Sequence, residues 1–97
     1  MGRVCVITGA SQGIGRAAAI RMSREPDISA LVLIARNASG LDETAAAVDR
    51  DGTAVEVIPY DLMDLDGIPA LVRGIHERFG SIDILLNIAG YADPQSL

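Results

Sequence analysis

A glycine-rich turn follows the first apolar run of the chain and limits the possible folds more than any other feature. The run Arg3–Ile7 is typical of a strand and leads directly into Thr8–Gly15, whose sequence is TGASQGIG. Glycines at such a turn allow a sharp change of direction and a close backbone approach to a ligand. A helix that begins there directs free N–H groups and the positive end of its dipole at the turn. Together these features predict a phosphate-binding site.

Each glycine of the turn has its own expected task. Gly9 lets the chain leave the strand sharply, Gly13 lets the backbone approach a pyrophosphate, and Gly15 lets the helix pack closely on the sheet. The other turn residues expected to contact the ligand are Ser11, Gln12 and Ile14. A flexible loop without a ligand is the alternative interpretation, but the position between a strand and a helix favours the phosphate site.

Apolar runs of strand length alternate with helix-length segments along the chain. The runs are nearly continuous, as in parallel strands covered on both faces, and comprise Arg3–Ile7, Ala30–Ala35, Ala54–Pro59 and Ile82–Ile88. Asp42 and Glu43 suit the first turn of the second helix, and Asp64 and Asp66 suit the start of the third. The order βαβαβαβ predicts one α/β domain over residues 1–97, with a parallel sheet and helices on both faces.

Charge and composition exclude several classes of partner. The formal net charge of the 97 residues is −5 at pH 7, and no basic cluster could follow a nucleic-acid backbone. No stretch has the length of a membrane span or the form of a signal peptide. Cys5 is the only cysteine, so an intrachain disulfide or a cysteine-based metal site is impossible. We therefore expect a cytoplasmic protein with no nucleic-acid partner, no membrane partner and no metal site.

Two further motifs follow the third and fourth runs. Asp61-Leu62 comes after the third run, and Asn87–Gly90, of sequence NIAG, ends the fourth. Ligands of open α/β sheets bind outside the carboxyl ends of the strands, which favours a binding role for both motifs. From the sequence alone, Asp61 could also be an ordinary helix-capping or turn carboxylate. Asn87 could equally serve to pin neighbouring strands together.

The three motifs, in this order and spacing, resemble those of the short-chain dehydrogenase/reductase family over nearly the whole chain. The turn has the family's Thr-Gly-x-x-x-Gly-Ile-Gly spacing. Asp61-Leu62 is similar to a pair whose carboxylate meets the adenine amino group, and Asn87–Gly90 resembles Asn-Asn-Ala-Gly, with Ile88 in place of the second Asn. The resemblance implies a Rossmann-type sheet with strand order 3-2-1-4, truncated here after the fourth strand. It also implies a dinucleotide contacted by Asp61, Leu62, Asn87, Ala89 and Gly90.

The end of the second strand indicates which dinucleotide is preferred. An acidic residue there binds the ribose 2′-hydroxyl of NAD, whereas a nearby arginine accommodates the 2′-phosphate of NADP. The strand ends at Ala35, and Arg36-Asn37 follow without a carboxylate. Arg36 can meet the phosphate with paired N–H donors, and Ser11 can add a hydroxyl. We expect NADP(H) to be favoured over NAD(H). Against this, Gln12 stands where NADP-preferring relatives often carry a second basic residue, and Arg36 could be a solvated surface charge.

The family's catalytic residues have no counterpart in the chain. The resemblance implies carbonyl reduction by a Ser, Tyr and Lys set, with the Tyr and Lys four residues apart on one helix. The chain contains no lysine, and the residues four positions after Tyr60 and Tyr91 are Asp64 and Gln95. His76, the only histidine, is expected to be a half-exposed helix residue. We therefore expect no catalytic residue here and no activity from this chain alone.

Three functional hypotheses remain open. The leading one is the amino-terminal, cofactor-binding half of an NADP-dependent short-chain oxidoreductase whose substrate is an alcohol or carbonyl compound. The second is an inactive dinucleotide-binding or sensor module that pairs with another chain. The third is a methyltransferase-like domain for S-adenosylmethionine, which Arg36 disfavours. An end after the fourth strand would leave Ile84-Leu85-Leu86 on an unpaired apolar edge, so we expect self-association or a missing carboxyl-terminal half.

Overall fold

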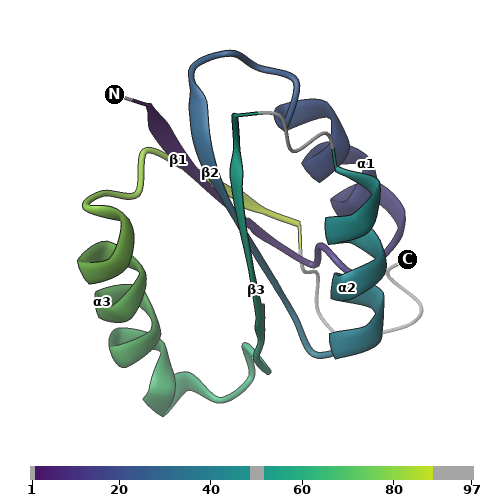
Figure 1. Ribbon diagram of the computed structural model, residues 1–97. Coiled ribbons are helices and arrows are strands. Elements are labelled where there is room, and N and C mark those ends of the chain that lie inside the picture. The colour runs from purple at the N-terminus through teal and green to yellow at the C-terminus, as the bar shows by residue number, and fades with distance from the viewer. Residues whose placement is uncertain (1, 49–51, 89–97) are drawn as a thin grey trace.

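The computed structural model describes residues 2–48 and 52–88. Figure 1 shows a sheet with helices packed on both of its faces. In chain order the elements are β1 (Arg3–Thr8), α1 (Gly13–Met22), β2 (Ile28–Ala35), α2 (Ala38–Ala47), β3 (Ala54–Pro59), a 3₁₀ turn (Leu65–Gly67), α3 (Ile68–Phe79) and β4 (Ile84–Asn87).

The sheet has the topology that the sequence predicts. Every pair of neighbouring strands is parallel, and the strand order is β3-β2-β1-β4. α1 and α2 cover one face of the sheet, and α3 lies on the other (Figure 1). β2 begins at Ile28, two residues before the predicted Ala30, because Ile28 pairs with Arg3. The predicted Rossmann-type fold is therefore confirmed.

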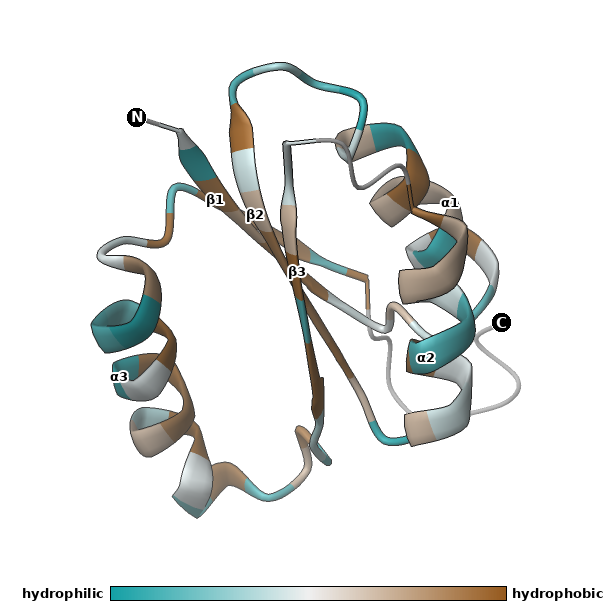
Figure 2. Cartoon of the chain, viewed as in Figure 1, coloured by the Kyte–Doolittle hydropathy of each residue, from teal (hydrophilic) through white to brown (hydrophobic). Residues whose placement is uncertain are grey.

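Alternating side chains of β1 and β2 fill two separate cores, one on each face of the sheet. The core beneath α1 and α2 includes Cys5, Ile7, Leu31 and Leu33, and the core beneath α3 includes Val4, Val6, Val32 and Ile34. Figure 2 shows the resulting band of hydrophobic residues along the centre of the sheet. Burial of each larger aliphatic side chain contributes about 1.5–3 kcal/mol. Burial on both faces explains why these strands read as continuous apolar runs.

The prediction that Asp42 and Glu43 lie in the first turn of α2 is wrong. α2 begins at Ala38, so both residues lie further along the helix. The reason is the Asn37 side chain, whose oxygen accepts a hydrogen bond from the Gly40 N–H at 3.0 Å and so caps the helix at this earlier point.

The prediction that Asp64 and Asp66 cap and charge the start of α3 is also wrong. A 3₁₀ turn precedes the helix and contains Asp66, while Asp64 precedes that turn and makes no side-chain cap. α3 itself has no acidic residue in its first turn. Pro69 occupies that first turn instead, where a missing N–H costs little. Gly80 ends the helix in the left-handed conformation, with φ of 88°.

β4, Ile84–Asn87, is shorter than the predicted Ile82–Ile88, and Asp83, the residue before it, forms an anchor. The Asp83 carboxylate accepts hydrogen bonds from the Val4 N–H at 2.8 Å and from the Ser81 hydroxyl at 2.9 Å. The Asp83 N–H donates to the Val4 carbonyl at 3.0 Å. These contacts attach the amino-terminal end of β4 to β1 before the ladder begins.

The same hydrogen bonds lower the pKa of Asp83. The Val4 N–H is the largest cause and the Ser81 hydroxyl the second, while burial opposes them and the charge of Arg3 adds to them. Asp83 therefore stabilises the fold at pH values above the pKa of aspartate in the unfolded chain, about 3.9. This contribution is lost as the pH falls through the lower folded-state pKa.

We predict that Asp83→Asn lowers the midpoint of urea unfolding at pH 7, because the charged acceptor of the Val4 N–H is lost. The difference from wild type should shrink as the pH falls below about 4, where the unfolded wild-type carboxylate also takes up a proton. Unfolding curves between pH 7 and about 3 measure this dependence. Asp66→Asn, on the exposed 3₁₀ turn, is the matched control. A difference that stays constant with pH would contradict the anchor.

Candidate functional site

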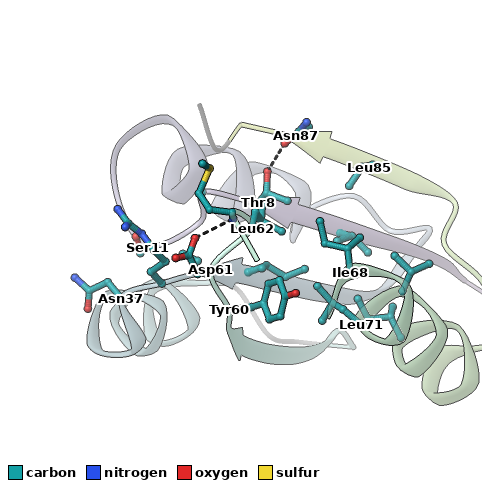
Figure 3. Close-up of a pocket in the computed structure, with 18 of the residues that line it drawn as sticks. Thr8, Ser11, Asn37, Tyr60, Asp61, Leu62, Ile68, Leu71, Leu85 and Asn87 are labelled. Atoms are coloured by element: carbon teal, nitrogen blue, oxygen red, sulfur yellow. Dashed lines mark hydrogen bonds between the residues drawn. The ribbon is translucent and has the colours of Figure 1, made fainter. Parts of the chain in front are cut away.

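A cleft of about 900 Å³ opens at the carboxyl ends of the strands. Its polar residues lie at or just after the carboxyl ends of all four strands that the structure describes. Its apolar residues come mainly from α3, the 3₁₀ turn and the adjoining strands (Figure 3). The predicted site residues that line it are Gly9, Ser11, Gln12, Arg36, Asn37, Asp61, Leu62 and Asn87. Gly13, Ile14 and Gly15 lie next to it in the turn and in α1, and the predicted contacts Ala89 and Gly90 lie outside the described residues.

The turn after β1 has the backbone that its glycines predict. Gly9 and Gly13 adopt positive φ values of 67° and 60°, which side chains resist. A Cβ on Gly13 would meet no protein atom within 4 Å, so the space beside this residue is open to a ligand. Ile14, the next residue, is 77% exposed. The turn therefore presents bare backbone to an open space.

Gly15 has a more specific role than the predicted packing of α1 on the sheet. A Cβ at this position would lie 1.8 Å from the carbonyl oxygen of Gly9. The first turn of α1 thus packs directly on the backbone of the glycine turn, at a distance that only a glycine permits. Gly15 therefore keeps the turn in its compact form.

Arg36 and Asn37 connect β2 to α2 at one end of the cleft. Arg36 is exposed, and no carboxylate within residues 2–48 and 52–88 pairs with it. Asn37 is the N-cap of α2 and also accepts a hydrogen bond from the Ser39 hydroxyl at 2.9 Å. Figure 3 shows Ser11 and Asn37 at the same end of the pocket. An exposed guanidinium, a helix N-terminus and the glycine turn therefore lie together there.

The carboxylate of Asp61 lies in the cleft and closes a turn. One of its oxygens accepts a hydrogen bond from the Met63 N–H at 2.9 Å. Its neighbour Tyr60 donates its hydroxyl to the Asp64 carbonyl at 2.5 Å. Desolvation, and after it the charges of Asp64, Asp61 and Asp66, raise the pKa of Tyr60, so this phenol stays protonated at neutral pH. The turn role considered for Asp61 is thus present, and a ligand role is compatible with it.

Asn87 joins the carboxyl ends of β1 and β4. Its side-chain oxygen accepts a hydrogen bond from the Thr8 hydroxyl at 2.8 Å (Figure 3). The two residues also pair in the parallel ladder. The strand-pinning role considered for Asn87 is therefore present at the edge of the cleft.

The sequence interpretation missed Arg16, which links the glycine turn to α2. Its guanidinium donates to the Ser11 carbonyl at 2.5 Å, to the Gly40 carbonyl at 3.2 Å and to the Thr44 hydroxyl at 2.9 Å. The one available signal was electrostatic. A cation near the positive N-terminal end of a helix is unfavourable unless it has partners elsewhere.

Other reactive groups lie away from the cleft. Cys5 is fully buried, and burial raises the pKa of its thiol to about 11, so it remains protonated. His76 is an exposed residue of α3. Across residues 2–48 and 52–88 no group of three His, Cys, Asp or Glu side chains is placed to hold a metal ion. In the same ranges no helix has the length and apolar character of a membrane span.

Comparison with known proteins decides the family. The family model described as short chain dehydrogenase matches residues 3–97. The chain belongs to the short-chain dehydrogenase/reductase family. It is 39% identical over 89 residues to a fatty acyl-CoA reductase of Mycobacterium tuberculosis, a match that covers 92% of this chain and 30% of that protein.

Solved structures of this family agree with the fold. An L-sorbose reductase from Gluconobacter frateurii, in complex with NADPH and L-sorbose, superposes with a TM-score of 0.78 and 37% identity, covering 92% of this chain and 34% of that one. An NAD⁺-bound xylitol dehydrogenase superposes with a TM-score of 0.82 and 32% identity, covering 93% and 34%. This short-chain dehydrogenase/reductase chain thus spans about a third of the proteins it matches.

We predict opposite effects of the same substitution at two helical glycines. Gly15→Ala should lower the free energy of unfolding by about 1–3 kcal/mol, because the new methyl group overlaps the Gly9 carbonyl. Gly74→Ala, on α3, meets no atom within 4 Å and should raise it by about 0.5–1 kcal/mol through helix propensity. Urea unfolding of both variants measures the two changes. A Gly15→Ala variant as stable as wild type would show that the turn is not held by this contact.

Proposed function

We propose that this chain is the cofactor-binding part of an oxidoreductase that transfers hydride between NADP(H) and an alcohol or carbonyl substrate. The observation that carries the preference for NADP(H) is Arg36. It follows β2 in the cleft, beside the capped start of α2, and the end of β2 carries no carboxylate. In Rossmann-type folds a cation at this place accommodates a ribose 2′-phosphate, and an acid there would repel it.

The residues of the cleft fit the parts of such a dinucleotide. The open space beside Gly13 and the start of α1 suit the pyrophosphate. Asp61 and Leu62 suit the adenine, and Arg36 with Asn37 suits the ribose phosphate. The full set of proposed contacts is Gly9, Ser11, Gln12, Gly13, Ile14, Gly15, Arg36, Asn37, Asp61, Leu62, Asn87, Ala89 and Gly90.

In this mechanism the described residues bind and orient the cofactor, and they do not transfer protons. A bound nicotinamide dinucleotide supplies or accepts the hydride. The glycine turn holds its phosphates, and the pin between Thr8 and Asn87 keeps β1 and β4 in register at the cleft. Tyr60 is not suited to act as a general acid, because its hydroxyl donates to a backbone carbonyl and its pKa is raised. We therefore propose that the chain alone binds cofactor without turnover.

We predict that NADPH binds more tightly than NADH and that Arg36→Gln removes the difference. The variant should weaken NADPH binding about tenfold, as expected for loss of charge-assisted hydrogen bonds, and leave NADH within about twofold. Fluorescence titration of both cofactors measures this. Arg73→Gln, on α3 and outside the lining of the cleft, is the matched control. Equal or tighter binding of NADH to the wild-type chain would refute the preference.

We further propose that the chain is cytoplasmic and that it associates through the outer edge of β4. Within the described residues no strand pairs with that edge. Leu85, on β4, is 59% exposed, and its side chain lines the cleft. Leu85→Lys should therefore shift the chain towards the monomer in sedimentation or size-exclusion measurements, because the charge opposes edge pairing. Glu77→Lys, an exposed change on α3, is the control. A monodisperse wild-type monomer with a sharp, high thermal transition would contradict the association.

A further inference from the structure

Two consecutive carbonyl groups of the glycine turn are held by side chains, one on α2 and one on α1. The Ala10 carbonyl accepts a hydrogen bond from the Thr44 hydroxyl at 2.7 Å, and the Ser11 carbonyl accepts one from Arg16 at 2.5 Å. Arg16 also donates to Thr44 through its Nε at 2.9 Å, so the two contacts form one network. Thr44 and Ala10 are fully buried. The turn is thus fastened from its side facing α2.

This fastening determines where the neighbouring amide groups point. Across a trans peptide bond the carbonyl of one residue and the N–H of the next point in opposite directions. Because the carbonyls of Ala10 and Ser11 point to α2, the N–H groups of Ser11 and Gln12 point away from it. Within residues 2–48 and 52–88 these two N–H groups have no acceptor. Unpaired backbone N–H groups that point the same way form a concavity suited to an anion.

The same network fixes the turn relative to the start of α2. Arg16 donates to the Gly40 carbonyl at 3.2 Å, in the first turn of α2. A Cβ on Gly40 would lie 2.9 Å from both the Cβ and the carbonyl oxygen of Ser11, and 3.3 Å from the Asn37 side chain. The backbone of α2 is therefore packed against the turn at a distance that leaves no room for a side chain. The glycine turn and the Arg36-Asn37 end of the cleft are therefore in direct contact through Gly40.

The ion pair between Arg16 and Glu43 does not explain why Arg16 lies here. Glu43 accepts from Arg16 at 3.1 Å, but the Glu43 side chain is 69% exposed, and pairs of this kind contribute little. The position of Arg16 near the positive end of α1 is also unfavourable for a cation. The contacts with carbonyl groups of the turn and of α2 are what this side chain adds.

We propose that Arg16 is a positioning residue for cofactor binding. It orients the turn amides that receive the pyrophosphate and sets their distance from the residues that receive the 2′-phosphate. This inference rests on the proposed function of the cleft. It implies that the affinity for a ligand spanning both ends of the cleft depends on Arg16. The affinity for a ligand held at the α2 end alone does not.

The test compares two ligands on the same variants of the chain. NADPH carries both the pyrophosphate and the 2′-phosphate, and adenosine 2′-monophosphate carries only the latter. Arg16→Leu should weaken NADPH about tenfold and adenosine 2′-monophosphate less than about twofold, as measured by calorimetry or NMR titration. Arg16→Lys retains a charge and donors for one or two carbonyls, so it should restore part of the NADPH affinity and remain folded even if Arg16→Leu does not. Arg21→Leu makes the same change at the other end of α1 and should leave both affinities unchanged.

Two results would overturn the inference. One is unchanged NADPH binding in both Arg16 variants, and the other is an equal loss for both ligands, which indicates a purely structural role. A wild-type chain that binds NADPH but not adenosine 2′-monophosphate would contradict the proposed 2′-phosphate contact. A wild-type chain that binds neither ligand would contradict the proposed function, and the inference about Arg16 would fail with it.

Discussion

The cleft depends on the position of β1 at the point where the strand order of the sheet reverses. β2 and β3 are added on one side of β1 and β4 on the other, and the connecting helices go to opposite faces. At such a point the chain leaves two neighbouring strands in opposite directions, and a crevice opens between their ends. The glycine turn lies at this point because it follows β1 directly. Burial of β1 on both faces holds it there, since its side chains contribute to both cores.

Features that depend on residues close together in the chain were predictable. The turn could be interpreted because the chemistry of Gly9, Gly13 and Gly15 is local. The parallel sheet followed from the alternation of strands and helices, and the strand order from the resemblance of the three motifs to the family. Two helix starts were mispredicted for reasons that are also local. The Asn37 cap that begins α2 was not recognised, and the 3₁₀ turn before α3 leaves no sequence periodicity to detect.

Features that depend on distance in space were not predictable. Arg16 and Thr44 are 28 residues apart and meet only because α1 and α2 pack side by side on one face. The position of Arg16 near the start of α1 indicates that its charge needs partners, but nothing in the sequence indicates which residues these are. The same holds for Asp83, which looked like the beginning of a strand and proved to be the anchor of one. For Asp61 and Asn87 the sequence left two roles open, and the hydrogen bonds supply the structural role of each.

The hydrogen bonds that join β1 to β4 have a consequence for how the chain assembles. The bonds from Val4 to Asp83 and from Thr8 to Asn87 each join residues 79 positions apart. Closing so long a loop costs more conformational entropy than pairing β1 with β2, and contacts of high sequence separation form slowly. During synthesis β1 emerges first, yet β4, its partner on one side, is among the last described segments to follow. One edge of β1 therefore stays unpaired until almost the whole described chain has been made.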